Sequence, residues 1–150
     1  MATLQGRLRQ DLTTAMRARD GLATATLRMA LAAVQLEEVA GAAARELSDD
    51  EVLAVLRRET KKRREAAEAF AGAGREESAA RERAEGELLE TYLPAQVSDQ
   101  ELAERVRAGI AESGATSIRD MGRAMKAVQV LVAGQADGAR VAAEVKRQLA

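Results

Sequence analysis

The stretch Glu90-Thr91-Tyr92-Leu93-Pro94-Ala95-Gln96 (ETYLPAQ) contains the single proline of this chain. Proline pushes the residue before it out of helical geometry, so a helix that includes Glu90 cannot continue past Leu93. Because helical patterns lie on both sides, the stretch predicts a boundary between two domains, residues 1–94 and residues 95–150. Tyr92 is expected to pack at this boundary, with its hydroxyl reaching water or backbone.

The composition on both sides of this boundary favours helices. Of the 150 residues, 47% are hydrophobic and 31% are charged, but only 1% are aromatic. Alanine, leucine, glutamate and arginine lose little freedom in a helix, whereas the residues typical of strands are scarce. The length suits one ordinary domain or two small ones. We therefore expect an all-α protein, with a bundle of about four helices before the boundary and three shorter helices after it.

Apolar spacing and capping residues predict the four helices of the first domain. Ser48 and Glu51 form a capping-box pattern at the start of a long third helix, which Gly72 and Gly74 should end. The second helix is expected to end near Gly41, and the fourth to run from Arg75 to Leu93. The residues predicted to face inward are Leu4, Leu8, Leu12, Met16, Leu27, Leu31, Val34, Val39, Val52, Val55, Leu56, Phe70, Ala80, Ala84, Leu88 and Tyr92.

Similar signals predict three helices after the boundary. Ser98 repeats the capping-box pattern with Glu101, and Ser117 is placed to cap the next helix. Gly122 lies inside that helical pattern, where glycine is unfavourable, so it predicts a close helix crossing. The inward residues of the three helices are predicted to be Leu102, Val106, Ile110, Ile118, Met121, Met125, Val128, Val132, Val141, Val145 and Leu149.

Residues 134–141 read GQADGARV and allow two interpretations. Gly134 suits a helix end and Asp137 suits the cap of the next helix, which together predict a turn. The alternative is a contact with a nucleic-acid phosphate through free amides beside Arg140. A Walker phosphate loop is excluded because its lysine and its Ser or Thr are missing. The turn is the favoured reading.

Several classes of chemistry are excluded or disfavoured by composition. The chain has no cysteine and no histidine, so disulfides, thiolate chemistry and Ser-His-Asp arrangements cannot occur, and the commonest zinc ligand is missing. Neighbouring acids such as Glu37 and Glu38 are interpreted as charged helix surface. We expect no catalytic residue, metal, cofactor or small-molecule substrate. Without a signal core or an 18-residue apolar run, a cytoplasmic protein without a membrane partner is expected.

Basic residues are the remaining candidates for a function. From Thr116 to the end the sequence contains six basic residues and three acidic ones, which gives this segment a net charge of +3. Because aromatics are scarce, any RNA would be bound through its phosphates and shape. The predicted contacts are Arg119, Arg123, Lys126, Arg140, Lys146 and Arg147. The run from Arg57 to Arg64 is interpreted first as an ion-paired helix surface, and second as a weaker RNA patch formed by Lys61, Lys62 and Arg64.

Six stretches, taken in order, resemble a known family. They are Leu27-Arg28-Met29, Leu47-Ser-Asp-Asp-Glu-Val-Leu53, Phe70-Ala-Gly-Ala-Gly-Arg75, Glu90-Thr-Tyr-Leu-Pro-Ala-Gln96, Asp120-Met-Gly-Arg-Ala-Met125, and Gly134-Gln-Ala-Asp-Gly138 followed by Val141. Their order and spacing make the chain similar to the free-standing YqeY-like proteins of the GatB/YqeY family. The resemblance implies an N-terminal helical bundle, a small C-terminal three-helix domain, and a relation to the tail of the B subunit of the glutamine-dependent aminoacyl-tRNA amidotransferase.

In that larger enzyme the tail resembles a reader of the tRNA body, and amide transfer occurs in other domains. Any carbon–nitrogen ligase label would therefore be inherited from the larger enzyme. Our first hypothesis is a non-catalytic module that binds tRNA or another structured RNA. The second is a protein-interaction module that docks on an amidotransferase or an aminoacyl-tRNA synthetase. The third is an enzyme that uses acids alone or acts within an amidotransferase.

Overall fold

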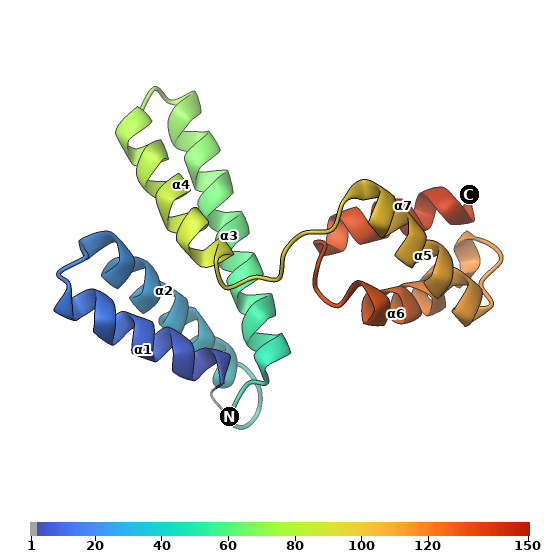
Figure 1. The fold of residues 1–150 in the computed structure, drawn as a ribbon, viewed down its shortest axis with the longest axis horizontal. Helices are drawn as coiled ribbons and strands as arrows, with labels where there is room; N and C mark the ends of the chain where they lie inside the picture. The colour runs from blue at the N-terminus through green and yellow to red at the C-terminus, as the bar shows by residue number, and fades with distance from the viewer. Residues whose placement is uncertain (1–2) are drawn as a thin grey trace. The chain divides into compact units, whose positions relative to one another are not determined.

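The computed structural model describes residues 3–150, and this part of the chain forms seven α-helices and no strand, which confirms the all-α prediction (Figure 1). The chain divides into two compact units, unit 1 (residues 1–93) and unit 2 (residues 94–150), and the division lies one residue before the predicted domain boundary. The helices are α1 (Leu4–Arg17), α2 (Gly21–Glu38), α3 (Asp49–Gly72), α4 (Glu76–Glu90), α5 (Asp99–Ser113), α6 (Met121–Val132) and α7 (Gly138–Leu149), with a 3-10 turn, η1 (Ile118–Asp120), before α6.

Unit 1 is organised around α3, its longest helix. The antiparallel pair α1–α2 packs against the first half of α3, and α4 returns along the second half (Figure 1). The capping box at the start of α3 is confirmed, since Ser48 Oγ accepts from the amide of Glu51 at 3.2 Å and Glu51 Oε1 accepts from the amide of Ser48 at 3.1 Å. The core residues of this unit are Leu8, Ala15, Leu27, Ala30, Leu31, Val34, Leu47, Val52, Val55, Leu56, Leu89 and Tyr92.

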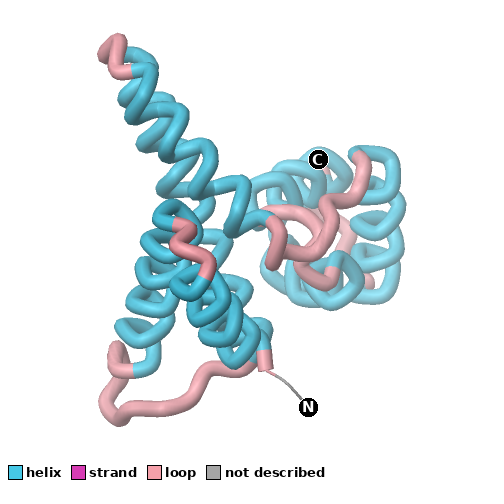
Figure 2. Tube along the Cα trace, turned by 60° about the vertical axis from the view of Figure 1, so that its left-hand side comes forward, coloured by secondary structure: helices cyan, strands magenta, loops and turns pink. Residues whose placement is uncertain are grey.

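Two predictions at the edge of this core are wrong. Val39 is exposed because α2 already ends at Glu38, three residues before Gly41, and residues 39–48 form a long loop (Figure 2). Met16 is also largely exposed, because it lies on the last turn of α1, beyond the part of the helix that α3 covers.

The buried face of α4 also differs from the prediction. Ala80 is exposed, and the buried residues of α4 are Ala79, Glu85, Gly86 and Leu89. The apolar pattern failed here because α4 turns carboxylates toward a cation of α3: the Arg63 guanidinium lies 3.3 Å from Glu82 and 3.8 Å from Glu85. Ion pairs therefore set the rotation of this helix.

Tyr92 is buried in unit 1 as predicted, but its hydroxyl partner is a side chain rather than water or backbone. The hydroxyl donates to the carboxylate of Asp11, and the Arg7 guanidinium lies over the ring at 4.7 Å. Burial, together with the hydrogen bond to Asp11, raises the pKa of the Tyr92 phenol. Tyr92 thus fastens the segment after α4 to α1.

Unit 2 is a three-helix unit with a valine-rich core. Its buried residues are Val97, Leu102, Val106, Ala124, Val128, Val132, Ala136, Val141, Val145 and Leu149. Ser98 caps α5 by accepting from the amide of Glu101 at 3.1 Å, and Gly114 ends α5 in the left-handed region at φ 71°. Ile118, predicted to face inward, is partly exposed because it lies in η1 before α6 begins.

The close helix crossing in unit 2 lies at a different glycine from the predicted one. Gly122 faces open space, and Ser117 makes no side-chain cap to α6 because η1 intervenes. Instead, a Cβ on Gly109 of α5 would lie 2.5 Å from Val128 Cγ2 and 2.8 Å from Val128 Cα. Gly109 therefore lets the backbones of α5 and α6 approach closely.

The stretch from Gly134 to Val141 is a turn between α6 and α7, as favoured. Helix α6 ends at Val132, and its cap is Ala133 at φ 50°, one residue before the expected cap Gly134, which follows at φ 76°. Asp137 caps α7 by accepting from the amide of Arg140 at 2.8 Å. The turn is fixed to the segment before α5, because the carbonyl of Gln135 accepts a hydrogen bond from the amide of Val97 at 2.8 Å.

In the part of the chain that the structure describes, no helix is both long enough and apolar enough to span a membrane.

Candidate nucleic-acid interface

The outer face of α6 and the short turn before it carry three of the predicted cations. Ala124, Val128 and Val132 are buried against α5 and α7, which turns Arg123 and Lys126 outward, one helical turn apart. Arg119 lies just before them in η1 and is also exposed. Helix α6 contains no acidic residue. We call Arg119, Arg123 and Lys126 the α6 cations.

The acid nearest to the α6 cations is already engaged. Asp120 accepts from the amide of Thr116 at 2.9 Å and lies 3.2 Å from the Arg123 guanidinium. The hydrogen bond from Thr116, followed by the charge of Arg123, lowers the pKa of Asp120. The Arg123 side chain nevertheless remains 59% exposed, so this pair leaves its outer edge accessible.

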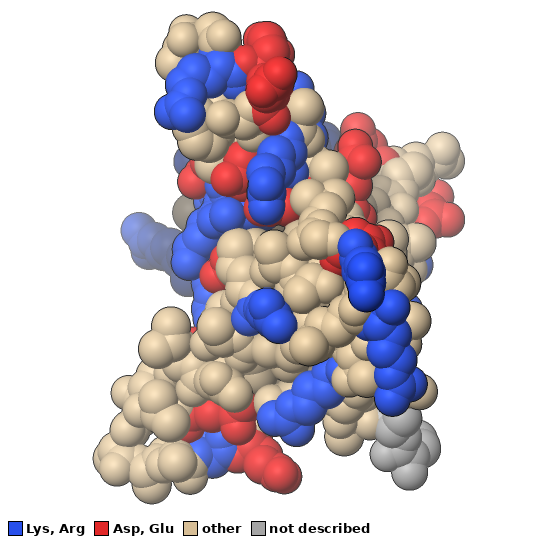
Figure 3. Space-filling model, turned by 90° about the vertical axis from the view of Figure 1, so that its left-hand side faces the viewer, with Lys and Arg blue, Asp and Glu red and all other residues tan. Residues whose placement is uncertain are grey.

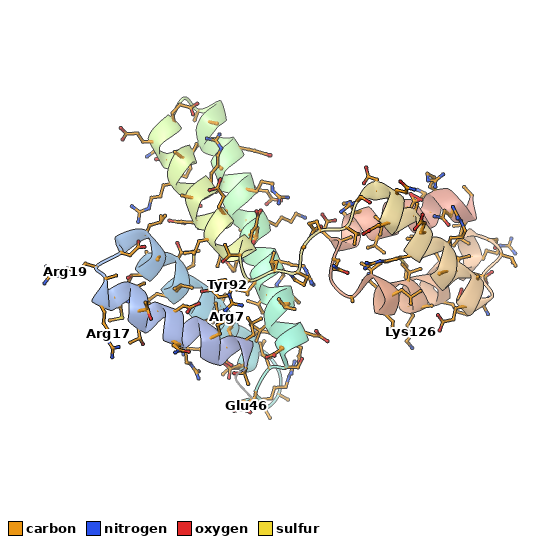
Figure 4. All side chains as sticks on the ribbon, viewed as in Figure 1. Arg7, Arg17, Arg19, Glu46, Tyr92 and Lys126 are labelled. Atoms are coloured by element: carbon orange, nitrogen blue, oxygen red, sulfur yellow. The ribbon has the colours of Figure 1, made fainter. Side chains whose placement is uncertain are left out.

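Lys126 and Arg119 have no ion-pair partner among residues 3–150. Figure 4 shows Lys126 projecting from α6 away from the other helices of unit 2. Two apolar side chains lie on the same helix and its leading turn: Val130 is 77% exposed and Ile118 is 46% exposed. The surface is therefore cationic with apolar positions at its margins.

The cations predicted on α7 are held differently. The Arg140 guanidinium donates to the carbonyl of Val97 at 3.0 Å and to Asp99 Oδ1 at 2.9 Å, so it fastens the start of α5 and is only 30% exposed. Arg147 forms a two-point pair with Glu144, with Nη2 at 2.6 Å from Oε1. Hydrogen bonds from Arg147 and Gln148 lower the pKa of Glu144 to about 2. Lys146 is exposed.

The three cations predicted on α3 each lie beside a carboxylate. Lys62 is 3.2 Å from Glu59, Arg64 is 3.6 Å from Glu90 of α4, and Lys61 is 4.0 Å from Glu65. This arrangement is the ion-paired helix surface that the sequence favoured. The Lys61 and Arg64 pairs are exposed on both sides, and pairs of this kind are weak and leave the cations able to exchange partners, so the RNA role of this patch stays a prediction.

Sequence reasoning missed the residues that build the scaffold of the α6 surface. Arg105 of α5 donates to Gln135 Oε1 at 2.6 Å and to the carbonyl of Val132 at 3.4 Å, which caps the end of α6. Gly109 sets the distance between α5 and α6. A possible signal was the placement of both residues on the helix face that also carries Leu102 and Val106.

Acidic residues do not gather into a site in the described part of the chain, where no group of three or more acids could hold a metal ion. Some of the acids that neighbour one another in sequence pair with cations. Glu37 pairs with Arg58 at 3.0 Å, and Glu85 pairs with Arg81 at 3.2 Å. These two carboxylates take part in ion pairs on and between helices.

Comparison with known proteins assigns the family. A family model described as Yqey-like protein matches residues 5–149, which is nearly the whole chain. The chain belongs to the YqeY-like family. No curated protein matches it. The match includes both units, so the α6 surface lies within the residues that the family model matches.

Proposed function

We propose that this YqeY-like protein is a non-catalytic helical module that binds tRNA or another structured RNA through the outer face of α6. One observation carries the proposal: two exposed cations lie on α6, which has no acid, and a third lies in η1 just before it, where the neighbouring Asp120 is engaged by the amide of Thr116 and by Arg123. The relation to the amidotransferase B-subunit tail that the resemblance implies makes tRNA the first RNA to test, in tRNA-dependent amidation or another part of tRNA metabolism.

Phosphate contacts explain how such a surface would bind without aromatic side chains. Guanidinium and ammonium groups attract phosphates irrespective of base sequence, and each contact releases counterions. The apparent log affinity should therefore fall with log salt by roughly 0.7–0.9 per contact. Binding of this type selects the shape of a folded RNA.

A filter-binding titration of the full chain with tRNA, repeated over a salt series, tests the proposal. The double variant Arg123→Glu/Lys126→Glu should abolish binding and flatten the salt dependence. The variant Arg9→Glu/Arg83→Glu, which makes the same charge change at two exposed sites of unit 1, is the control. Unaltered binding by the α6 variant, or equal loss in the control, would contradict the assignment.

Docking on a protein is a second proposal, favoured by the exposed Val130 and Ile118 beside the cations. Apolar residues within a polar rim are typical of protein interfaces. An amidotransferase or an aminoacyl-tRNA synthetase would be the partner. The variant Ile118→Ser/Val130→Ser should then lose a nuclease-resistant complex with that purified partner while keeping its RNA affinity. Retained complex formation would remove this alternative.

A further inference from the structure

A second group of cations lies at the turn between α1 and α2 in unit 1. Arg17 is in the last turn of α1, Arg19 is in the turn itself, and Arg28 is on α2. All three are exposed, and none has a carboxylate partner among residues 3–150. We call them the turn arginines. The near balance of acids and bases over the whole chain hides this group in the sequence.

The charge at this turn is not neutralised locally. From Leu12 to Leu36 the chain has three arginines and one acid, Asp20. That acid is engaged as the cap of α2, where it accepts from the amide of Ala23 at 3.0 Å. The arginines of α3 contrast with this, since Arg58, Arg63 and Arg64 each lie within 4 Å of a glutamate.

Two of the turn arginines, Arg19 and Arg28, border an open depression with a floor of small residues. Its volume is about 440 Å³, and it is lined by Met16, Arg19, Gly21, Thr24, Ala25 and Arg28. Arg28 Nη2 lies 3.9 Å from Met16 Sδ, which holds the guanidinium at the rim. Figure 4 shows Arg17 and Arg19 projecting outward at this end of the α1–α2 pair.

The backbone of Arg19 adds an independent observation. Arg19 adopts φ 56°, a left-handed conformation that is unfavourable for residues with a Cβ. Among residues 3–150, glycine occupies this region at Gly74, Gly114 and Gly134, and the other non-glycine residue there is the small Ala133 at φ 50°. The α1–α2 turn instead places a long cation at the strained position. Helices commonly end with a left-handed residue, here after the C-cap Ala18, and strained residues also cluster at functional sites.

We propose that the turn arginines form a second phosphate-contact surface for folded RNA, separate from the α6 cations. The guanidinium group matches phosphate oxygens through paired hydrogen bonds. Figure 3 faces this end of unit 1 and shows blue side chains across its middle, with most of the red surface above or below. The proposal takes its ligand class, folded RNA, from the proposed function, on which it rests. Its residues belong to a different surface, in unit 1.

RNA fits this surface better than an acidic protein does. A stable protein interface needs a central apolar or aromatic anchor, and the depression offers only Met16 among larger apolar side chains. A phosphate backbone needs cations and an open surface, which the turn supplies. A nucleic-acid backbone brings several linked phosphates to the arginines at once, so its contacts reinforce one another. A single phosphate ion on this open surface lacks that advantage.

Titration of the full chain with tRNA, and with polyglutamate as a competitor, tests the inference. The variant Arg17→Gln/Arg19→Gln/Arg28→Gln should bind about tenfold more weakly near physiological salt, with the salt slope reduced by roughly 2–3. The control Arg9→Gln/Arg83→Gln/Arg107→Gln removes three other exposed arginines from α1, α4 and α5. Its affinity should change less than threefold.

The outcomes separate this inference from the proposed function. If the turn variant binds like the control while Arg123→Glu/Lys126→Glu abolishes binding, the inference is overturned and the proposed function stands. If only the turn variant loses binding, the inference stands and the assignment to α6 fails. Absence of tRNA binding by the unaltered protein overturns both. Competition by polyglutamate as effective as that by tRNA, at equal charge, overturns the assignment to RNA.

A single substitution at Arg19 distinguishes binding from folding. Arg19→Gly relieves the left-handed strain, so its melting temperature should stay unchanged or rise, while its tRNA affinity should fall severalfold. A lowered melting temperature with unchanged affinity would assign Arg19 to the structure of the turn alone and overturn its RNA role.

Discussion

The α3–α4 pair and the α5–α6 pair both pack two antiparallel helices, but with different chemistry. Between α3 and α4, Arg63 lies between Glu82 and Glu85, so cations and acids are part of the seam. Between α5 and α6, the seam is apolar and Gly109 lies directly against Val128. Charges used in packing are not available to a ligand. Where the seam is apolar, the cations of α6 remain on the outer surface.

The largest expected effect is at the apolar seam. Gly109→Ala places a Cβ within 2.8 Å of Val128 Cα, so the two helices must separate. We expect a loss of about 3 kcal/mol in the free energy of unfolding of unit 2, the upper part of the range for overpacking. Chemical denaturation followed by circular dichroism measures it.

Gly86→Ala in the α3–α4 pair is the matched control. Its Cβ would lie 3.5 Å from Arg63 Cβ, an ordinary contact, so better helix propensity should leave stability unchanged or raise it by up to about 1 kcal/mol. Equal losses of stability in the two variants would show that α5 and α6 approach each other no more closely than α3 and α4 do.

The polar seam should be more sensitive to loss of its cation. Arg63→Met leaves Glu82 and Glu85 without their shared partner, and their side chains are only 17% and 10% exposed. We expect the free energy of unfolding to fall by about 2 kcal/mol, which is less than the loss expected for a fully buried pair. Adding Glu82→Gln should restore part of the loss. If the single variant is as stable as the unaltered protein, the ion pairs do not hold α4 in place.

RNA affinity should distinguish the two groups of predicted cations. Lys61→Gln/Lys62→Gln removes charges that already lie beside Glu65 and Glu59, so tRNA affinity should fall less than about threefold. Arg123→Gln/Lys126→Gln should cost more, about tenfold. Filter binding at a fixed salt concentration compares the two. A greater loss for the α3 variant would reverse the ranking of the surfaces.

The smallest expected effect is a decrease in thermal stability at acidic pH. The pKa of Glu51 is lowered from 4.5 to about 2 by hydrogen bonds from Arg45 and the amide of Ser48, and that of Glu144 is lowered to the same value by Arg147 and Gln148. A lowered folded pKa stabilises the native state above the unfolded value, and the contribution disappears as pH falls through the folded value. The melting temperature should therefore decline between pH 4.5 and about 2.

Arg147→Gln isolates the contribution of unit 2 to this decline. The variant should melt lower than the unaltered protein near neutral pH, and the difference should narrow at the acid end of the window. A constant difference across the window would mean that the pair does not perturb Glu144. Because both acids are solvent-accessible, raised salt should reduce the effect.

Local rules in the sequence predicted local structure well. The capping residues Ser48, Ser98 and Asp137 start their helices where expected, because a cap depends on only four consecutive residues. Helix rotation was less predictable. The buried face of α4 was misassigned because Arg63, far away in sequence, decides which α4 residues turn inward. The helix crossing was assigned to Gly122 rather than Gly109 for the same reason: only the packed neighbour distinguishes two helical glycines.

The candidate site shows the same division. The sequence by itself determined the helices, their caps and the presence of cations in the second half of the chain, because these follow from composition and short-range spacing. Only the tertiary structure decided which cations remain accessible. Arg140 is held by Asp99 and Val97 and is only 30% exposed, whereas Arg123 stays 59% exposed beside Asp120, because ion pairing depends on distances between elements that sequence spacing does not specify.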